Sequence, residues 1–272
     1  MPCYPVEYRR LGRTREKVST IGMGTWRIGV FANEEERVRQ VDALRLGISL
    51  GMNLIDTAEL YAGGKSEEVV ADAIAESREN VFLATKVSRE NLRHDAVLAA
   101  CEGSLRRLRT SYIDLYQVHW PNPNVPIEDT MRAMEELVES GKVRYIGVSN
   151  FGVELMEAAR TSLSKNEVVS DQVEYSLLNR SAESELLPYL KRENTTLVAY
   201  SPLGRGNISS TLPRPVLKTY TVSPAQAMLN WVTRDEQVVA IPKAANLGHI
   251  RENASSVSAR FTSGEYESIS AG

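Results

Sequence analysis

Four polar residues that suit proton transfer follow short apolar segments of the chain. They are Asp56 in NLIDTA, Tyr61 in ELYAGGKSEE, Lys86 in VFLATKV and His119 in IDLYQVHW. A lysine that closes an apolar segment loses its hydration unless an anion is close, so we expect Lys86 to pair with Asp56. An ammonium beside a phenol lowers the phenol pKa from about 10, which would make Tyr61 a general acid. A nearby imidazole could orient a carbonyl oxygen, so the four together suit carbonyl reduction.

The elements that must position these residues alternate along the chain. Short apolar runs predict eight strands, at 21–24, 53–57, 81–87, 113–119, 145–149, 169–174, 197–200 and 238–241. Amphipathic stretches predict eight helices, at 34–50, 66–77, 95–108, 128–140, 153–163, 182–192, 224–234 and 247–257. Such alternation indicates parallel strands joined by helices, and eight repeats favour a closed barrel. We predict one α/β domain over residues 1–272, a (β/α)8 TIM barrel whose strand ends carry the active site.

Two segments fall outside this alternation. Residues 6–19, which contain YRRLG and REKVS, predict a β-hairpin that closes the bottom of the barrel. Residues 203–221 contain Gly, Ser and Pro and predict a long loop after the seventh strand. In a barrel this loop lies on the catalytic face.

The composition excludes several classes of function. The 272 residues contain 32 Lys and Arg against 35 Asp and Glu, and the net charge of −3 argues against nucleic-acid or polybasic membrane binding. No apolar run approaches the roughly 18 residues of a membrane span, and MPCYPVEYRRLG lacks the apolar stretch of a signal peptide, so we expect a cytoplasmic protein. The two cysteines, Cys3 and Cys101, predict neither a disulfide framework nor a metal site.

Over nearly its whole length the sequence resembles the aldo-keto reductase superfamily, from LGRTREKVSTIGMGTW to IPKAANLGHIRENA. The resemblance implies a (β/α) barrel that binds a nicotinamide cofactor in an extended form, without a Rossmann domain. It also implies that Asp56, Tyr61, Lys86 and His119 form the catalytic tetrad. In that tetrad Tyr61 gives the proton, Lys86 and Asp56 tune it, and His119 positions the carbonyl.

The same resemblance implies a set of cofactor-binding residues. Near the nicotinamide it implies Ser149, Asn150, Gln172 and Tyr200, and the ring of Tyr200 would stack on the nicotinamide. Gly24 and Thr25 would approach the cofactor from the end of the first strand. Along the pyrophosphate it implies Ser201, Leu203 and Arg205. At the adenosine end it implies Lys243 for the 2′-phosphate, with Glu252 and Asn253 on the adenine side.

Two positions depart from the pattern of the superfamily at the adenosine end. Ala244 follows Lys243 where many members have Ser or Thr, and His249 stands where many have arginine. A neutral imidazole binds phosphate less well than a guanidinium does. We therefore expect an NADPH-preferring enzyme that also uses NADH.

Trp26 and Trp120 follow strand ends and are predicted to line the substrate pocket. The chain ends soon after its last predicted helix, without the long C-terminal loop of many relatives. This favours an open pocket for small polar aldehydes or ketones, such as glyceraldehyde, methylglyoxal or sugar-derived carbonyls. Two alternatives remain, a sugar or polyol dehydrogenase working in the reverse direction and a cofactor-sensing regulatory subunit. The sequence does not indicate an oligomeric state.

Overall fold

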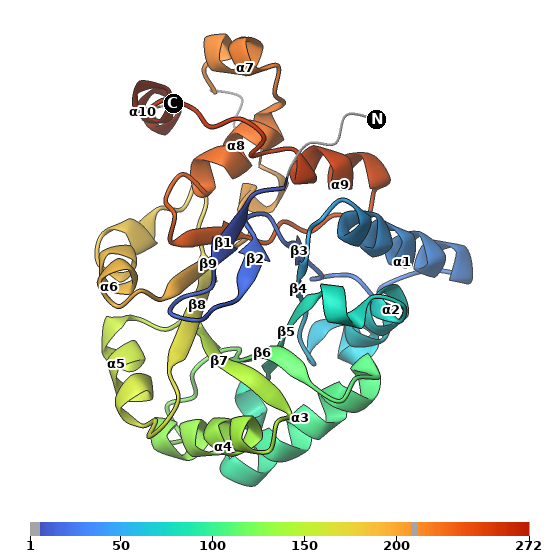
Figure 1. Cartoon of the computed structure of the whole chain (residues 1–272), viewed down its shortest axis with the longest axis vertical. Coiled ribbons are helices and arrows are strands. Elements are labelled where there is room, and N and C mark those ends of the chain that lie inside the picture. Colours follow the sequence, from blue (N-terminus) through green and yellow to red (C-terminus); the bar gives the residue numbers. More distant parts are fainter. Residues whose placement is uncertain (1–5, 208–211, 272) are drawn as a thin grey trace.

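A computed structural model describes residues 6–207 and 212–271, and a barrel of parallel strands forms its centre (Figure 1). Each strand pairs with its neighbour in sequence, which gives the order β3 to β10 around the barrel. The strands are β3 (Met23–Gly24), β4 (Leu54–Asp56), β5 (Phe82–Val87), β6 (Ile113–Val118), β7 (Val143–Ser149), β8 (Val168–Glu174), β9 (Thr196–Tyr200) and β10 (Val238–Ala240).

The barrel closes where its first and last strands meet. The backbone amides of Gly22 and Gly24 donate to the carbonyl oxygens of Ala240 and Pro242, at 2.8 and 3.1 Å. Gly24 permits this approach, because a Cβ atom there would lie 2.5 Å from the carbonyl oxygen of Ile241. The predicted closed α/β barrel is confirmed.

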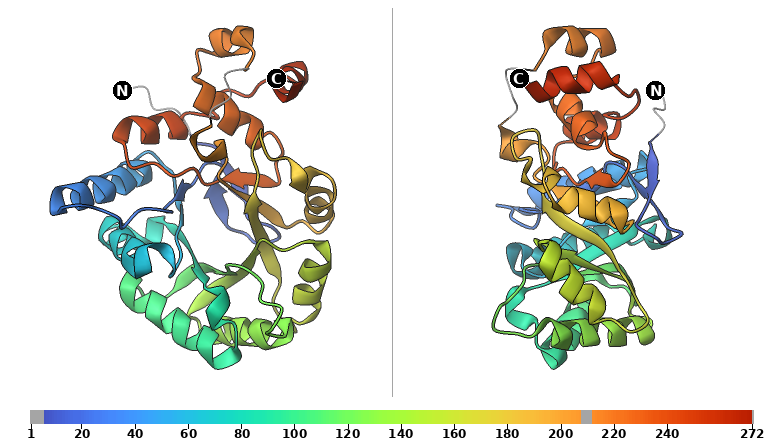
Figure 2. Two further views of the ribbon diagram at one scale, coloured as in Figure 1. Left: turned by 180° about the vertical axis from the view of Figure 1, so that it is seen from behind. Right: turned by 90° about the vertical axis from the view of Figure 1, so that its left-hand side faces the viewer.

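Helices cover the outside of the barrel (Figures 1 and 2). The eight predicted helices appear as α1 (Glu34–Ser49), α2 (Lys65–Ile74), α3 (His94–Leu108), α4 (Ile127–Glu139), α5 (Val153–Thr161), α6 (Leu186–Arg192), α8 (Pro224–Val232) and α9 (Leu247–Ala254). The start of α8 shows why the helix boundaries can be predicted from the sequence. Ser223 and Gln226 form a reciprocal capping box around Pro224 at the first helical position. None of the described helices is long and apolar enough to cross a membrane.

Two short helices were not predicted from the sequence. Helix α7 (Arg214–Tyr220) lies within the stretch 203–221, which was predicted wholly as a loop, and α10 (Ser263–Ala271) follows α9. Each buries few side chains, Val216 in α7 and Ile269 in α10, so neither leaves a strong amphipathic pattern. Residues 208–211 of the predicted loop, and Cys3, lie outside the described residues.

The predicted hairpin consists of β1 (Tyr8–Arg10) paired antiparallel with β2 (Lys17–Ser19). Val18 of this hairpin belongs to the same buried cluster as Leu54 and Phe82, which begin strands β4 and β5. The hairpin therefore covers the amino-terminal end of the barrel, and the opposite end stays available for a site.

Candidate active site

The structure brings Asp56, Tyr61, Lys86 and His119 together at the carboxyl end of the barrel. Asp56 ends β4, Lys86 lies near the end of the neighbouring β5, and His119 follows β6 directly. Tyr61 opens the short turn η1 (Tyr61–Gly64) that follows β4. Adjacent parallel strands end at one edge, so the barrel gathers side chains that are up to 63 residues apart in sequence, 119 − 56 = 63.

Lys86 and Asp56 form the predicted buried ion pair. The Lys86 Nζ atom donates to Asp56 Oδ1 at 2.6 Å and to the backbone oxygen of Thr57 at 2.8 Å. Burial alone lowers the pKa of the wholly buried Lys86, but contacts with Asp56 and Tyr61 outweigh it and the pKa is raised overall. Lys86 is therefore an ammonium at neutral pH.

The phenol of Tyr61 lies against this pair. The Lys86 Nζ atom is 5.2 Å from the centroid of the Tyr61 ring, and the His119 ring meets Tyr61 edge-on with centroids 5.6 Å apart. The predicted net lowering of the Tyr61 pKa is wrong. Burial raises the pKa of the phenol, and this effect outweighs the opposing effect of the Lys86 ammonium. The phenol thus keeps its proton at neutral pH.

His119 is a neutral imidazole in this setting. Burial, with a smaller effect of the Lys86 ammonium, lowers the His119 pKa to about 3. Within the described residues its Nδ1 atom is buried without a hydrogen-bond partner. Orphaned buried donors are rarer than orphaned acceptors, which favours the proton on Nε2 as the available donor.

We expect His119 to make the protein less stable in mild acid. Its pKa is 6.5 in the unfolded chain and about 3 in the folded one, so the unfolded state binds more protons below pH 6.5. At pH 5 this costs about 2 kcal/mol of unfolding free energy relative to pH 7. Urea denaturation at both pH values gives the difference in unfolding free energy between pH 7 and pH 5. In His119→Gln this difference should be smaller by this amount. An unchanged difference would mean that the folded imidazole titrates normally.

Two features hold the segment that carries Tyr61, a turn with left-handed backbone conformation and the side chain of Arg107 on α3. Ala62, Gly63 and Gly64 have φ values of 50, 63 and 91°. A Cβ atom at Gly64 would lie 2.6 Å from the Cδ atom of Arg107. Arg107 in turn donates through Nε to the buried carboxylate of Glu67 at 2.6 Å. Gly64 therefore leaves the space in which Arg107 lies against the turn, and Glu67 holds Arg107 there.

The residues expected near a nicotinamide form one hydrogen-bonded group at the ends of β7, β8 and β9. Asn150 has a φ of 64°, and its amide donates to Ser149 Oγ at 2.9 Å and to the backbone oxygen of His119 at 3.0 Å. The Tyr200 hydroxyl donates to Asn150 Oδ1 at 3.0 Å. The Gln172 Nε2 atom donates to Asp56 Oδ2 at 2.8 Å. The group is therefore rigid and joined to the ion pair.

At the end of β3, Gly24 and Thr25 have structural roles. Gly24 lies where the first strand of the barrel contacts the segment after the last one, and Thr25 is wholly buried. The Thr25 hydroxyl donates to the Asp56 backbone oxygen at 2.9 Å and accepts from Ser66 Oγ, also at 2.9 Å. These contacts fix the segment from which Trp26 projects.

The segment expected along a pyrophosphate follows β9. Ser201 and Arg205 have φ values of 49 and 58°, so the backbone turns tightly here, and Leu203 packs against the core. The Arg205 guanidinium forms an ion pair with Glu174 at 3.0 Å, and its side chain remains 63% exposed. The guanidinium thus keeps N–H groups free for solvent or a ligand.

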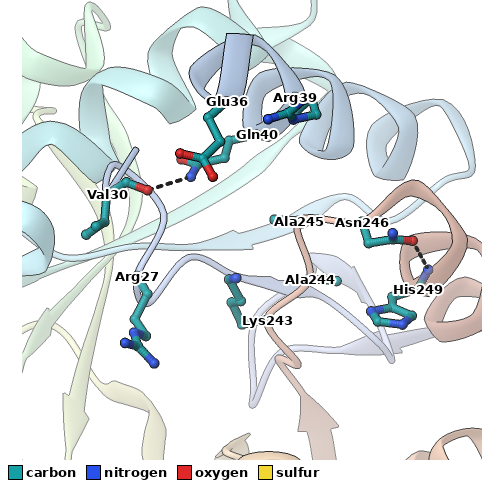
Figure 3. Close-up of a pocket in the computed structure, with 10 residues that line it drawn as sticks. All are labelled: Arg27, Val30, Glu36, Arg39, Gln40, Lys243, Ala244, Ala245, Asn246 and His249. Atoms are coloured by element: carbon teal, nitrogen blue, oxygen red, sulfur yellow. Dashed lines mark hydrogen bonds between the residues drawn. The ribbon is translucent and has the colours of Figure 1, made fainter. Parts of the chain in front are cut away.

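Lys243 and His249 line a cavity of ≈ 590 Å³ between α1 and the segment that leads into α9 (Figure 3). Its lining also holds two further cations that were not predicted from the sequence, Arg27 after β3 and Arg39 on α1. Burial and the nearby Arg27 guanidinium lower the Lys243 pKa, and the lining holds three cations, Arg27, Arg39 and Lys243, against one carboxylate, that of Glu36. The cavity is therefore suited to an anionic group.

The two residues expected on the adenine side lie on α9. The carboxylate of Glu252 accepts from the hydroxyl of Ser223, which caps α8, and Asn253 is buried. Their described contacts are structural.

Arg39 lies in no recognisable sequence motif. Its place in the cavity follows only from the position of α1 beside the segment that carries Lys243.

Trp26 and Trp120 flank the ends of β3 and β6 with 56% and 44% of their surfaces exposed. The Arg27 guanidinium lies 5.5 Å from the Trp26 ring centroid. Large exposed aromatic side chains beside a polar buried cluster are typical of a substrate-binding rim.

An ammonium, a phenol and a neutral imidazole thus lie together at the carboxyl end of the barrel, beside a cationic cavity. The Aldo/keto reductase family model matches residues 20–271. The chain belongs to the aldo/keto reductase family and is an oxidoreductase.

Individual relatives agree with this membership. Methylglyoxal reductase YeaE of Escherichia coli is 39% identical over 251 residues, covering 90% of this chain and 87% of the relative. Glyoxal reductase of Bacillus subtilis is 37% identical over 231 residues, with 84% and 80% covered. An aldo/keto reductase from Klebsiella pneumoniae, solved with NADP and acetate, is 37% identical with a TM-score of 0.88, covering 97% of this chain and 94% of the solved one.

Proposed function

We propose that this enzyme reduces aldehydes and ketones to alcohols with NADPH, and that Tyr61 protonates the carbonyl oxygen. The observation that carries this proposal is the Tyr61 phenol lying against the buried Lys86–Asp56 pair and the neutral ring of His119. A bound nicotinamide would supply hydride to the carbonyl carbon. The side chains of the protein carry out the remaining steps.

In this mechanism His119 donates from Nε2 to the carbonyl oxygen and orients it towards Tyr61. As negative charge develops on that oxygen, the Tyr61 proton moves to it, so the O–H bond of the phenol breaks and that of the alcohol forms. The charged Lys86 stabilises the phenolate left on Tyr61. Asp56 keeps Lys86 charged, and water then returns a proton to Tyr61.

The residues present fit a nicotinamide cofactor. Gln172 uses its amide nitrogen on Asp56, which leaves its carbonyl oxygen as an acceptor for a carboxamide N–H. Asn150 and Ser149 lie beside it, and the half-buried ring of Tyr200 offers a face for stacking. Ser201, Leu203 and Arg205 would follow the pyrophosphate, and Gly24 and Thr25 would approach the cofactor from the first strand end.

At the adenosine end, we assign the 2′-phosphate to the cationic cavity. Lys243 and Arg27 face the same space, and the guanidinium of Arg39 can replace the arginine that this chain lacks at His249. Glu252 and Asn253 on α9 would support the adenine side. Relatives solved with NADP and NADPH support this assignment.

We expect His249→Arg to increase affinity for NADPH without changing affinity for NADH. A third guanidinium in the cavity, besides those of Arg27 and Arg39, adds a charge-assisted contact to the 2′-phosphate, which NADH lacks. Quenching of protein fluorescence should show a dissociation constant for NADPH that falls about tenfold. Arg39→Gln should weaken NADPH by a similar factor. Equal effects on both nucleotides would contradict the assignment.

For the substrate, we propose small polar aldehydes and ketones, with methylglyoxal and glyoxal first among them. Relatives of this chain are named as reductases of these two compounds. Trp26 and Trp120 would line the pocket. Initial rates with NADPH across methylglyoxal, glyoxal, glyceraldehyde and bulky steroid ketones test the proposal. Preference for the steroids would contradict it, and absence of turnover with every carbonyl would remove it.

Two further expectations complete the proposal. We expect residues 1–272 to form one domain, and the backbone pairing between the first and last barrel segments supports this. The cytoplasm is the expected compartment, since two cysteines in 272 residues do not make the disulfide framework that is typical of small exported domains.

A further inference from the structure

Gln117 is a wholly buried amide at the centre of the barrel, and the mechanism above gives it no role. It lies on β6 opposite Lys86 of β5 in the strand register. Its Nε2 atom donates to Asp56 Oδ2 at 3.2 Å. A buried amide costs free energy that an apolar side chain of the same size does not, unless its hydrogen bonds are made.

Asp56 is held by donors on both of its oxygens. Oδ1 accepts from Lys86 at 2.6 Å, and Oδ2 accepts from Gln117 at 3.2 Å and from Gln172 at 2.8 Å. Hydrogen bonds to a carboxylate favour its ionised form and fix its plane. The two amides therefore hold the face of Asp56 that the ammonium does not contact.

The neighbouring strand leaves room for Gln117. A Cβ atom at Gly147 on β7 would lie 2.9 Å from Gln117 Cγ and 2.7 Å from Ser170 Oγ. The φ of Gly147 is outside the left-handed region, so space accounts for this glycine rather than backbone conformation. A larger residue at position 147 would push Gln117 away from Asp56.

We propose that Gln117 is a positioning residue, which holds the Asp56 carboxylate in the orientation that pairs it with Lys86 beside Tyr61. This inference rests on the proposed roles of Tyr61 and Lys86 in carbonyl reduction. Without the Gln117 amide, Asp56 Oδ2 loses one of its two donors, and the carboxylate is held less firmly against the Lys86 ammonium, whose pKa it raises.

The test compares pH profiles of kcat for Gln117→Met, which keeps the side-chain length but removes the donor. We expect kcat at pH 7 to fall roughly tenfold and the alkaline limb of the profile to move downward by about one pH unit, because a less well paired Lys86 loses its proton at lower pH. The dissociation constant for NADPH, measured by fluorescence, should stay within about twofold of that of the parent enzyme. Gln117→Glu can donate only when protonated, so its activity relative to the parent should rise as the pH falls.

Ser170→Ala is the matched control. Ser170 lies beside Gly147 in the same layer, and within the described residues its hydroxyl is buried without a partner. This variant should keep the parent profile. A folded Gln117→Met enzyme with the parent kcat and profile would overturn the inference. If Gln117→Met does not fold, Gln117→Leu takes its place with the same expected and overturning results.

Failure of this inference can be told from failure of the proposed function. The proposed function fails in the parent enzyme, as NADPH oxidation that no carbonyl stimulates. The inference about Gln117 fails only in the variants, as an unchanged pH profile in an enzyme that still reduces carbonyls.

Discussion

Tyr61→Phe should reduce kcat for carbonyl reduction by roughly 10² to 10⁴, because the variant lacks the only proton that the proposed mechanism delivers to the carbonyl oxygen. The ring of phenylalanine keeps the edge-on contact with His119. Affinity for NADPH should therefore change by less than about twofold. Single-turnover measurements at saturating NADPH, with fluorescence titration of the nucleotide, separate the loss of chemistry from a loss of binding.

Tyr116→Phe provides a matched control for this variant. Tyr116 is also a barrel tyrosine, but it is wholly buried, and among the described residues its hydroxyl has no hydrogen-bond partner. Removing that hydroxyl should leave kcat unchanged. Full activity in Tyr61→Phe, or an equal loss in both variants, would end the assignment of Tyr61 as the proton donor.

Lys86→Met should lower both stability and activity strongly. The Lys86 side chain is wholly buried and that of Asp56 is 3% exposed, so the variant leaves a carboxylate inside the barrel without its cation. Breaking a buried ion pair in this way typically costs 3–5 kcal/mol of unfolding free energy, measurable by urea denaturation. We also expect kcat to fall at least about 100-fold, since nothing then stabilises the Tyr61 phenolate.

The double variant Asp56→Asn/Lys86→Met separates these two effects. It removes the unpaired charge, so the unfolding free energy should recover most of the loss, whereas kcat should stay low. The surface pair of Lys165 with Glu139 supplies a control, and Lys165→Met should alter neither quantity. Recovery of kcat in the double variant would show that Lys86 acts only through folding.

Much of the site could be predicted because its signals are local in the sequence. A lysine at the end of VFLATKV must meet an anion, and the eight-fold alternation places it beside Asp56 at a strand end. The capping box of α8 and the hairpin at 6–19 are equally local patterns. Helices α7 and α10 were missed because each buries too little to leave such a pattern.

The sequence by itself determined the strand and helix alternation, the closed barrel and the four side chains at its carboxyl end, since these follow from periodicity and spacing. Only the tertiary structure decided the net pKa of Tyr61, the placement of Arg39 opposite Lys243, and the contact of Gln117 with Asp56. Burial, like-charge proximity and strand register depend on residues distant in the chain. No local sequence pattern therefore predicts these three features.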